Sequence, residues 1–230
     1  MKKIVVLLLI AALVVPTLFS CVEQVVTPVN VVAGMYKVSQ PTKVVATTKQ
    51  IIVPDILELD GRYEIVTGYV DSKPASVYKM QTEEIRSVEE GGQNEEVKEL
   101  VKTTSRVVEA IEGKGSRING GDWNAEGTVW NIGRGRMALN LSNDYVKSYT
   151  YNNHVLTLEV AKENAANVLG EEYAQYIDSD VHIVIVDDGA VVVSVELTYF
   201  IAANEEANLG RSEMHVKVDY TYDIERITIE

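Results

Sequence analysis

The residues best suited to bind a ligand lie in the Gly- and Asn-rich segment 114–136, which contains both tryptophans of the chain. Aromatic rings beside amides and carboxylates can stack on a sugar or an aromatic ligand and hydrogen-bond to its edges. Two arginines on an expected strand add cations for an acidic ligand. The candidate ligand-binding residues are Trp123, Trp130, Asp122, Asn124, Arg134 and Arg136. The alternative is that both tryptophans anchor an irregular loop to the core.

The other reactive side chains form no recognisable catalytic or metal-binding pattern. His154, His182 and His215 are far apart in sequence and lack the ligand spacing of zinc sites. The chain has no Gly-x-Ser-x-Gly nucleophile motif and no phosphate-binding glycine loop. The sequence therefore predicts no catalytic residue, no metal and no cofactor. A hydrolase that uses paired carboxylates is the enzymatic alternative, although 34 acidic residues will produce such pairs by chance.

The chain begins with the layout of a secretory signal. Lys2 and Lys3 precede an unbroken apolar run over residues 4–15, and Pro16 follows it. The run is shorter than the roughly 20 apolar residues that span a bilayer. Cys21, the only cysteine, comes directly after this leader and cannot form an intrachain disulfide.

The segment Leu18-Phe19-Ser20-Cys21 resembles the lipobox of bacterial lipoprotein precursors. The resemblance implies that residues 1–20 are a signal peptide, that Cys21 is lipidated, and that the chain is then anchored to the membrane. Lipid chains anchor by burying methylenes, each worth about 0.8 kcal/mol. An uncleaved helical anchor and free secretion are the alternatives. The favoured interpretation places the protein in the bacterial cell envelope, outside the cytoplasm.

The charge of the chain excludes one class of partner. The chain carries 34 acidic and 21 basic residues, and two of the lysines lie in the leader, so the remainder has a formal charge of −15. Nucleic-acid binding needs clusters of Lys and Arg, so no nucleic-acid partner is expected. The acidity also argues against a body that lies flat on anionic headgroups. The expected partners are the membrane, through the N-terminal lipid, and an envelope protein.

Two helices are expected from the apolar spacing. In residues 95–112 the apolar positions form one stripe with a 3.6-residue period, with Asn94 as the N-cap and Gly113 at the end. Residues 161–177 form the second expected helix, interrupted near Gly170. Residues 21–34 are Val-rich and are interpreted as a short tether or a first strand.

Strands are expected through most of the remainder. Asp60-Gly61 suits the turn of a hairpin over residues 56–66. In the last fifty residues, Val181–Val186 is apolar on both faces apart from His182 and is expected to be a central strand, whereas Val191–Tyr199 and Met214–Tyr222 alternate as strands do. The sequence therefore predicts an α+β domain over residues 35–230: an antiparallel sheet with a C-terminal meander and about two helices packed on one face. A division into two lobes near residues 113–127 is possible.

These observations favour a membrane-anchored envelope lipoprotein with a non-catalytic structural, assembly or binding role. The first alternative is a binding module for a glycan at Trp123 and Trp130, or for a lipid within a curved sheet. The envelope hydrolase with paired carboxylates is the second alternative.

Overall fold

The computed structural model describes residues 26–38, 40–52, 57–89, 96–129, 139–204, 210–223, 225–227 and 229. The elements follow one another in this order: α2 (Pro28–Val38), β1 (Lys43–Ile52), β2 (Leu57–Val70), β3 (Lys73–Glu89), β4 (Glu96–Ile111), β5 (Gly115–Ile118), η2 (Asn143–Tyr145), β6 (Ser148–Asn152), β7 (Val155–Val160), η3 (Lys162–Asn164), α3 (Ala165–Leu169), α4 (Glu171–Ala174), β8 (Val181–Asp187), β9 (Val192–Ile201), β10 (Ser212–Thr221) and β11 (Glu225–Arg226).

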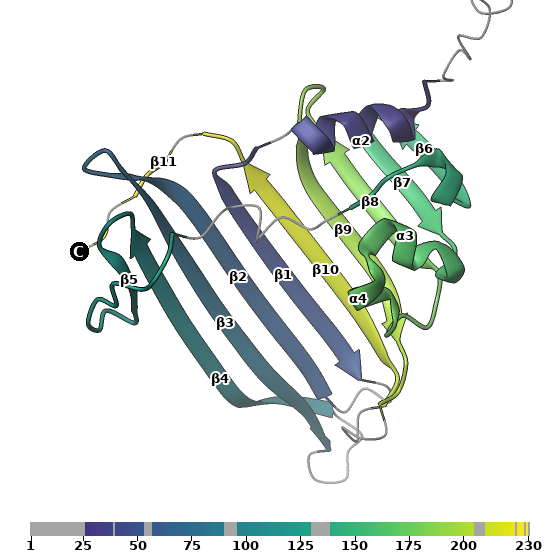
Figure 1. The fold of residues 1–230 in the computed structure, drawn as a ribbon. Coiled ribbons are helices and arrows are strands. Elements are labelled where there is room, and N and C mark those ends of the chain that lie inside the picture. The colour runs from purple at the N-terminus through teal and green to yellow at the C-terminus, as the bar shows by residue number, and fades with distance from the viewer. Residues whose placement is uncertain are drawn as a thin grey trace, which may run out of the picture.

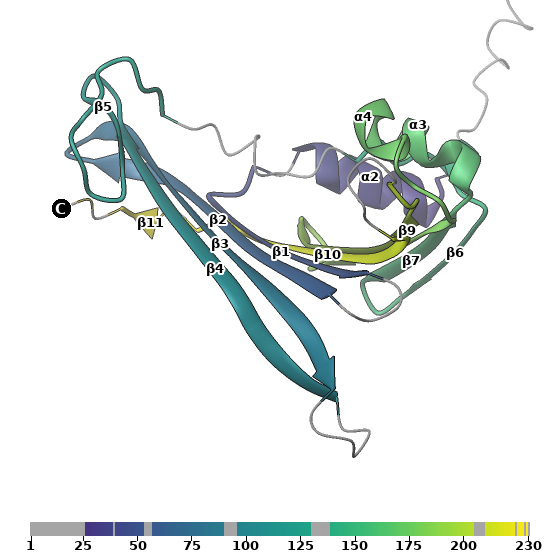
Figure 2. The same ribbon diagram turned by 90° about the horizontal axis from the view of Figure 1, so that it is seen from below.

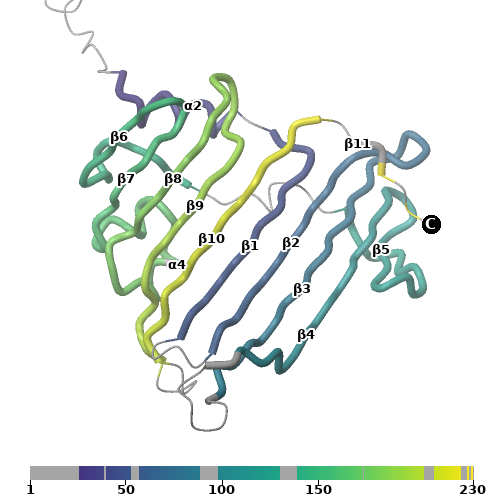
Figure 3. Tube along the Cα trace, turned by 180° about the vertical axis from the view of Figure 1, so that it is seen from behind, coloured from purple at the N-terminus to yellow at the C-terminus, as the bar shows by residue number. Residues whose placement is uncertain are grey.

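One sheet dominates the described residues (Figure 1). Ten strands lie in the order β5-β4-β3-β2-β1-β10-β9-β8-β7-β6, and each pairs antiparallel with its neighbour. The short β11 pairs parallel with the end of β2. Strands from the two halves of the chain meet at the centre, where β1 pairs with β10 (Figure 3). The expected α+β class is therefore wrong, because the fold is one large sheet with short helices rather than a balance of the two.

The N-terminal helix α2 replaces the strand that valine content had favoured for residues 28–34. Thr27 precedes the helix, and its hydroxyl accepts a hydrogen bond from the backbone N–H of Asn30 at 3.3 Å. Pro28 occupies the first helical position, where its missing N–H costs nothing. The buried residues Val29, Val32, Ala33 and Tyr36 have helical spacing and pack on the sheet. Capping and spacing therefore outweigh the strand preference of valine.

The expected helix over residues 95–112 is also wrong, because this segment is β4. Strand β4 pairs with β3 from Glu96 to Ile111, with one register irregularity. Val108 and Ala110 are buried on one face, whereas Val107 and Ile111 pack on the other face in a second apolar cluster. Both faces bury apolar residues at the end of β4, and the exposed Leu100 and Val101 lie where the register shifts, so adjacent apolar residues resemble a helical stripe.

Asp60-Gly61 does not form a turn. Strand β2 runs straight through both residues, with Gly61 opposite Thr48 on β1 and Thr82 on β3. The chain reverses instead at Asp71-Ser72, where both residues have positive φ values of 49° and 64°. An Asp-Gly pair suits a tight turn, but here the long pairing on both sides of β2 keeps it extended.

The sheet is curved, and the helices lie on its concave side over β6–β9 (Figure 2). The main core lies between them: Leu156, Leu158, Ile183 and Val195 are fully buried there. The helical segment after residue 161 is broken at Gly170, whose φ of 94° ends α3. None of the described helices is long and apolar enough to cross a membrane.

Candidate ligand-binding trough

The two faces of the sheet differ in chemical character. Even-numbered residues of β1 share the face of Val44, which packs in the helix-covered core, so they point to the concave side. By register, Leu59 and Tyr63 of β2, Met80 of β3 and Met214 of β10 point the same way. The opposite, convex face of the central strands is lined mainly by charged residues and threonines. The concave side thus carries more apolar side chains, whereas charged residues and threonines predominate on the convex side.

A hollow of about 400 Å³ lies on the concave face over β10, β1, β2, β3 and β4, and we call it the trough. Its lining includes Thr48, Gln50, Leu59, Tyr63, Thr82 and Met214. These side chains are only half-buried, because no described helix covers this part of the sheet. The trough therefore combines apolar contacts from Leu59, Tyr63 and Met214 with hydroxyl, amide and charged groups.

Gly61 shapes the floor of the trough. A Cβ atom at this position would lie 2.5 Å from the Thr48 Oγ1 atom and 2.8 Å from Cε2 of the Tyr63 ring. The ring of Tyr63 thus lies across Gly61, and the absence of a side chain there keeps the floor low. A glycine within a strand costs stability, so its presence at position 61 is consistent with the close approach of Thr48 and the Tyr63 ring to the backbone there.

One end of the trough is polar. Glu84 of β3 and Lys102 of β4 lie opposite each other and both line the hollow. Gln50 donates from Nε2 to the Ser212 hydroxyl at 2.8 Å. The trough is thus amphiphilic, with charged groups on its β3 and β4 side and the Gln50 amide between Leu59 and Met214.

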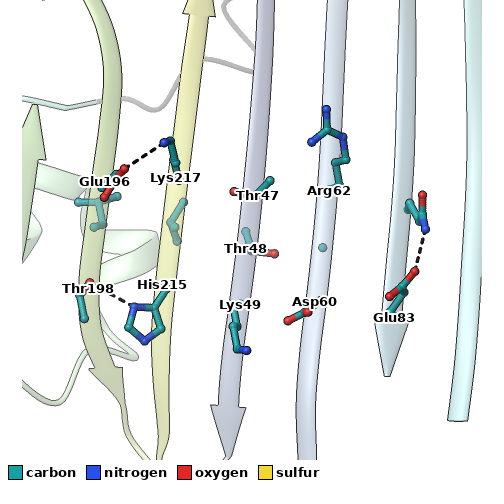
Figure 4. A pocket seen from close by; sticks show the side chains of 14 residues that line it. Thr47, Thr48, Lys49, Asp60, Arg62, Glu83, Glu196, Thr198, His215 and Lys217 are labelled. Atoms are coloured by element: carbon teal, nitrogen blue, oxygen red, sulfur yellow. Dashed lines mark hydrogen bonds and ion pairs between the residues drawn. The ribbon is translucent and has the colours of Figure 1, made fainter. Parts of the chain in front are cut away.

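A second hollow of about 430 Å³ lies on the convex face of the same strands (Figure 4). Lys217 lies 3.2 Å from Glu196 within this hollow, and that hydrogen bond raises the pKa of Lys217, whereas Lys49 pairs with Glu58 outside the hollow. Asp60 and Glu83 lie directly opposite each other on β2 and β3. The Oδ1 atom of Asp60 is buried without a hydrogen-bond partner. These two carboxylates are the pair that the hydrolase alternative would use.

The histidines lie apart from the trough, and each has its own partner. His182 Nδ1 lies 2.5 Å from Glu159, and His215 Nε2 lies 3.2 Å from Glu213. Thr198 of β9 stands between these two histidines in the register. In the described part of the chain, no group of three or more His, Cys, Asp or Glu residues is arranged to hold a metal ion.

Only part of the segment predicted to bind ligands is described. Trp123 packs on the second apolar cluster, and its ring lies 4.0 Å from Lys114 Nζ and 5.1 Å from the Arg117 guanidinium carbon. Asp122 is exposed, and Asn124 forms a backbone bridge to Ser116 of β5. Trp130, Arg134 and Arg136 lie outside the described residues, as does Cys21. The binding role of this segment stays a prediction.

Sequence reasoning missed the trough residues. Leu59, Tyr63 and Met214 come from strands far apart in the chain, and they meet only because β1 joins β2 to β10. The strand pattern of the last fifty residues already placed Met214 on one face with Val216 and Val218. The same signal in β2 was concealed by the interpretation of Asp60-Gly61 as a turn.

The fold and trough define a protein built on a single curved sheet whose concave face carries more apolar side chains than its convex face. No family model matches the chain, and no curated protein matches it. A solved structure of a DUF1329 family protein from Desulfovibrio piger is similar over 88% of this chain and 96% of that chain, at 9% sequence identity and a TM-score of 0.27. A likeness at that TM-score carries no argument about fold or function.

Proposed function

We propose that the protein is a lipid-anchored, non-catalytic binding protein of the bacterial envelope whose trough holds the acyl chain of an amphiphile. The observation that carries the proposal is the half-buried hollow on the concave face, in which Leu59, Tyr63 and Met214 lie beside hydroxyl, amide and charged groups. Exposed apolar surface is costly in water, and a ligand that covers it gains about 25 cal/mol per Å² of buried apolar area.

The shape and chemistry of the trough support an amphiphile over a wholly apolar ligand. Leu59, Tyr63 and Met214 provide contact for methylene groups, whereas Glu84 and Lys102 at one end can pair with a charged headgroup. The lipobox-like leader supports a lipid anchor on Cys21. Such an anchor would keep the trough close to a membrane, which is a source of amphiphiles.

The anchor is tested with the full-length precursor in a bacterial host. We expect Cys21→Ala to move the protein from the membrane fraction to the soluble fraction, because acylation needs the thiol. Mass spectrometry of the wild-type protein should detect acyl chains on Cys21. Membrane retention of an uncleaved Cys21→Ala protein would instead support a helical anchor.

Ligand binding is tested with the fluorescent apolar probe N-phenyl-1-naphthylamine, followed by displacement with a lysophospholipid. We expect saturable binding to the wild-type protein and at least tenfold weaker binding to Leu59→Lys, because a charge replaces an apolar contact, which is equivalent to about 1.4 kcal/mol or more. The matched control is Ile51→Lys, which places the same charge on the convex face of the adjacent strand.

Two results would count against the proposal. One is the absence of saturable probe binding by the folded wild-type protein. The other is equal binding by the Leu59→Lys and Ile51→Lys variants when both have native circular dichroism spectra.

A further inference from the structure

The anchor constrains which end of the molecule faces the bilayer. Thr27 comes six residues after Cys21, and a fully extended chain covers at most about 3.5 Å per residue, so the start of α2 lies within about 21 Å of a lipidated Cys21. Helix α2 cannot swing away from the sheet, because Val29, Val32 and Ala33 are buried against it and the Tyr36 hydroxyl lies 3.0 Å from that of Tyr220. The tether therefore orients the whole sheet.

The start of α2 lies on the β6 side of the sheet in Figures 1, 2 and 3. The β5 edge is at the opposite end of the strand order, nine strand spacings away. At about 4.8 Å per spacing, the flat width would be about 43 Å, and curvature shortens the direct distance. A tether of about 21 Å thus favours the β6 end as the membrane-proximal one.

That end carries exposed apolar and aromatic side chains. Val26 is 76% exposed and Val31 on α2 is 41% exposed. On the edge strand β6, Tyr149 is 39% and Tyr151 is 38% exposed. Tyrosine has an apolar ring with a polar tip and is favoured at the boundary between lipid and water. The nearby Lys147 is paired with Asp180 at 2.9 Å, so this lysine does not provide an unpaired cation for lipid headgroups.

We infer that the end formed by the start of α2 and by β6 rests on the lipid bilayer, with Tyr149, Val26 and Val31 at the headgroup boundary. This inference rests on the lipid anchor of the proposed function but not on the ligand in the trough. The contact is apolar, so it forms on neutral phosphatidylcholine and is insensitive to salt. It holds the β5 edge and Trp123 away from the membrane.

The test uses the lipidated protein in phosphatidylcholine vesicles that contain spin-labelled lipid as a quencher. A bimane fluorophore is attached to Thr150→Cys on β6 or to Thr103→Cys on β4, which are both exposed threonines on strands. Acylated Cys21 does not react with the label. We expect at least threefold stronger quenching at position 150 than at position 103, with no change on addition of salt.

A second variant separates surface contact from simple proximity. Tyr149→Ser should reduce quenching at position 150 while the protein still floats with the vesicles, whereas Tyr176→Ser, at another exposed tyrosine, should not. If the protein floats with the vesicles but quenching is equal at positions 150 and 103, the inference about which end faces the membrane is overturned and the anchor is not. Wild-type protein that does not float with the vesicles overturns the anchor itself.

Discussion

The buried carboxylate of Asp187 links two hairpin turns through hydrogen bonds, so its removal tests the fold. The side chain of Asp187 has 0% exposure. It accepts hydrogen bonds from the Tyr151 hydroxyl at 3.0 Å, from His154 Nδ1 at 2.9 Å and from the Gly189 backbone N–H at 2.8 Å. Because a carboxylate only accepts, His154 is the donor in its pair. The three donors belong to β6, the β6–β7 turn and the β8–β9 turn.

The expected loss in the free energy of unfolding on Asp187→Ala depends on which of the three donors can hydrogen-bond to water instead. A hydrogen bond to a charged group contributes about 1.5–3 kcal/mol net, but Tyr151 and His154 are exposed and can bond to water once the carboxylate is gone. The loss should therefore be about 2–3 kcal/mol rather than the sum of three bonds. For a chain of this size, each kcal/mol shifts Tm by about 2–4 °C, so Tm should fall by about 4–12 °C.

The assay is urea and thermal denaturation followed by circular dichroism. Asp187→Asn keeps the shape and part of the acceptor set, so it should cost less than Asp187→Ala. The matched control is Asp219→Ala, because Asp219 is exposed on the convex face and has only a 3.8 Å ion pair with Lys217. If Asp187→Ala unfolds at the same urea concentration as Asp219→Ala, the assigned role of Asp187 is refuted.

Three further predictions concern the core, the dependence of stability on acidic pH, and the trough. Leu158→Ala, at a fully buried core position, should lower the free energy of unfolding by about 3 kcal/mol in urea titrations, and a loss under 1 kcal/mol would contradict the assigned core. Hydrogen bonds from Lys49 and Lys98 lower the pKa of Glu58 against the opposing effect of desolvation. The stabilisation of the fold by ionised Glu58 is therefore complete above the ordinary glutamate pKa and is lost as pH falls through the lowered pKa of the folded state. Glu58→Gln should thus destabilise the protein at pH 7 and make little difference at pH 2. Gly61→Ala should displace the Tyr63 ring and weaken probe binding in the trough, and unchanged affinity would show that the floor is not the binding surface.

The strands near the C-terminus were predictable because one of their faces is buried and the other is wet. Buried and more exposed residues alternate over residues 195–198 of β9 and 217–220 of β10, as the alternation in sequence predicts. In the sequence, the apolar positions are even-numbered from Met214 to Tyr222 and odd-numbered at Ile227 and Ile229, and the structure shows a matching change of face. Tyr220 belongs to the concave core, whereas Ile227 packs in the convex cluster with Val66 and Ile111. Both observations depend on local order that the sequence records directly.

The central strands were not predictable in the same way, because their neighbours decided their conformation. Residues 96–111 have a helical spacing of apolar groups, yet β3 offers a partner along their whole length. Asp60-Gly61 has the composition of a turn, yet pairing with β1 and β3 holds it extended. Long-range pairing outweighs local preference, since each preference is worth about 1 kcal/mol or less and many paired residues act together.

By itself, the sequence determined the signal-like leader, the isolated Cys21, the acidic charge and the alternation of the C-terminal strands. Each of these is a property of composition or of short-range order. The tertiary structure alone decided that β1 joins the two halves of the sheet, that the concave face carries the trough, and that Gly61 lies beneath the Tyr63 ring. The physical reason is that a trough is formed by the register between strands, and register depends on contacts between residues more than a hundred positions apart.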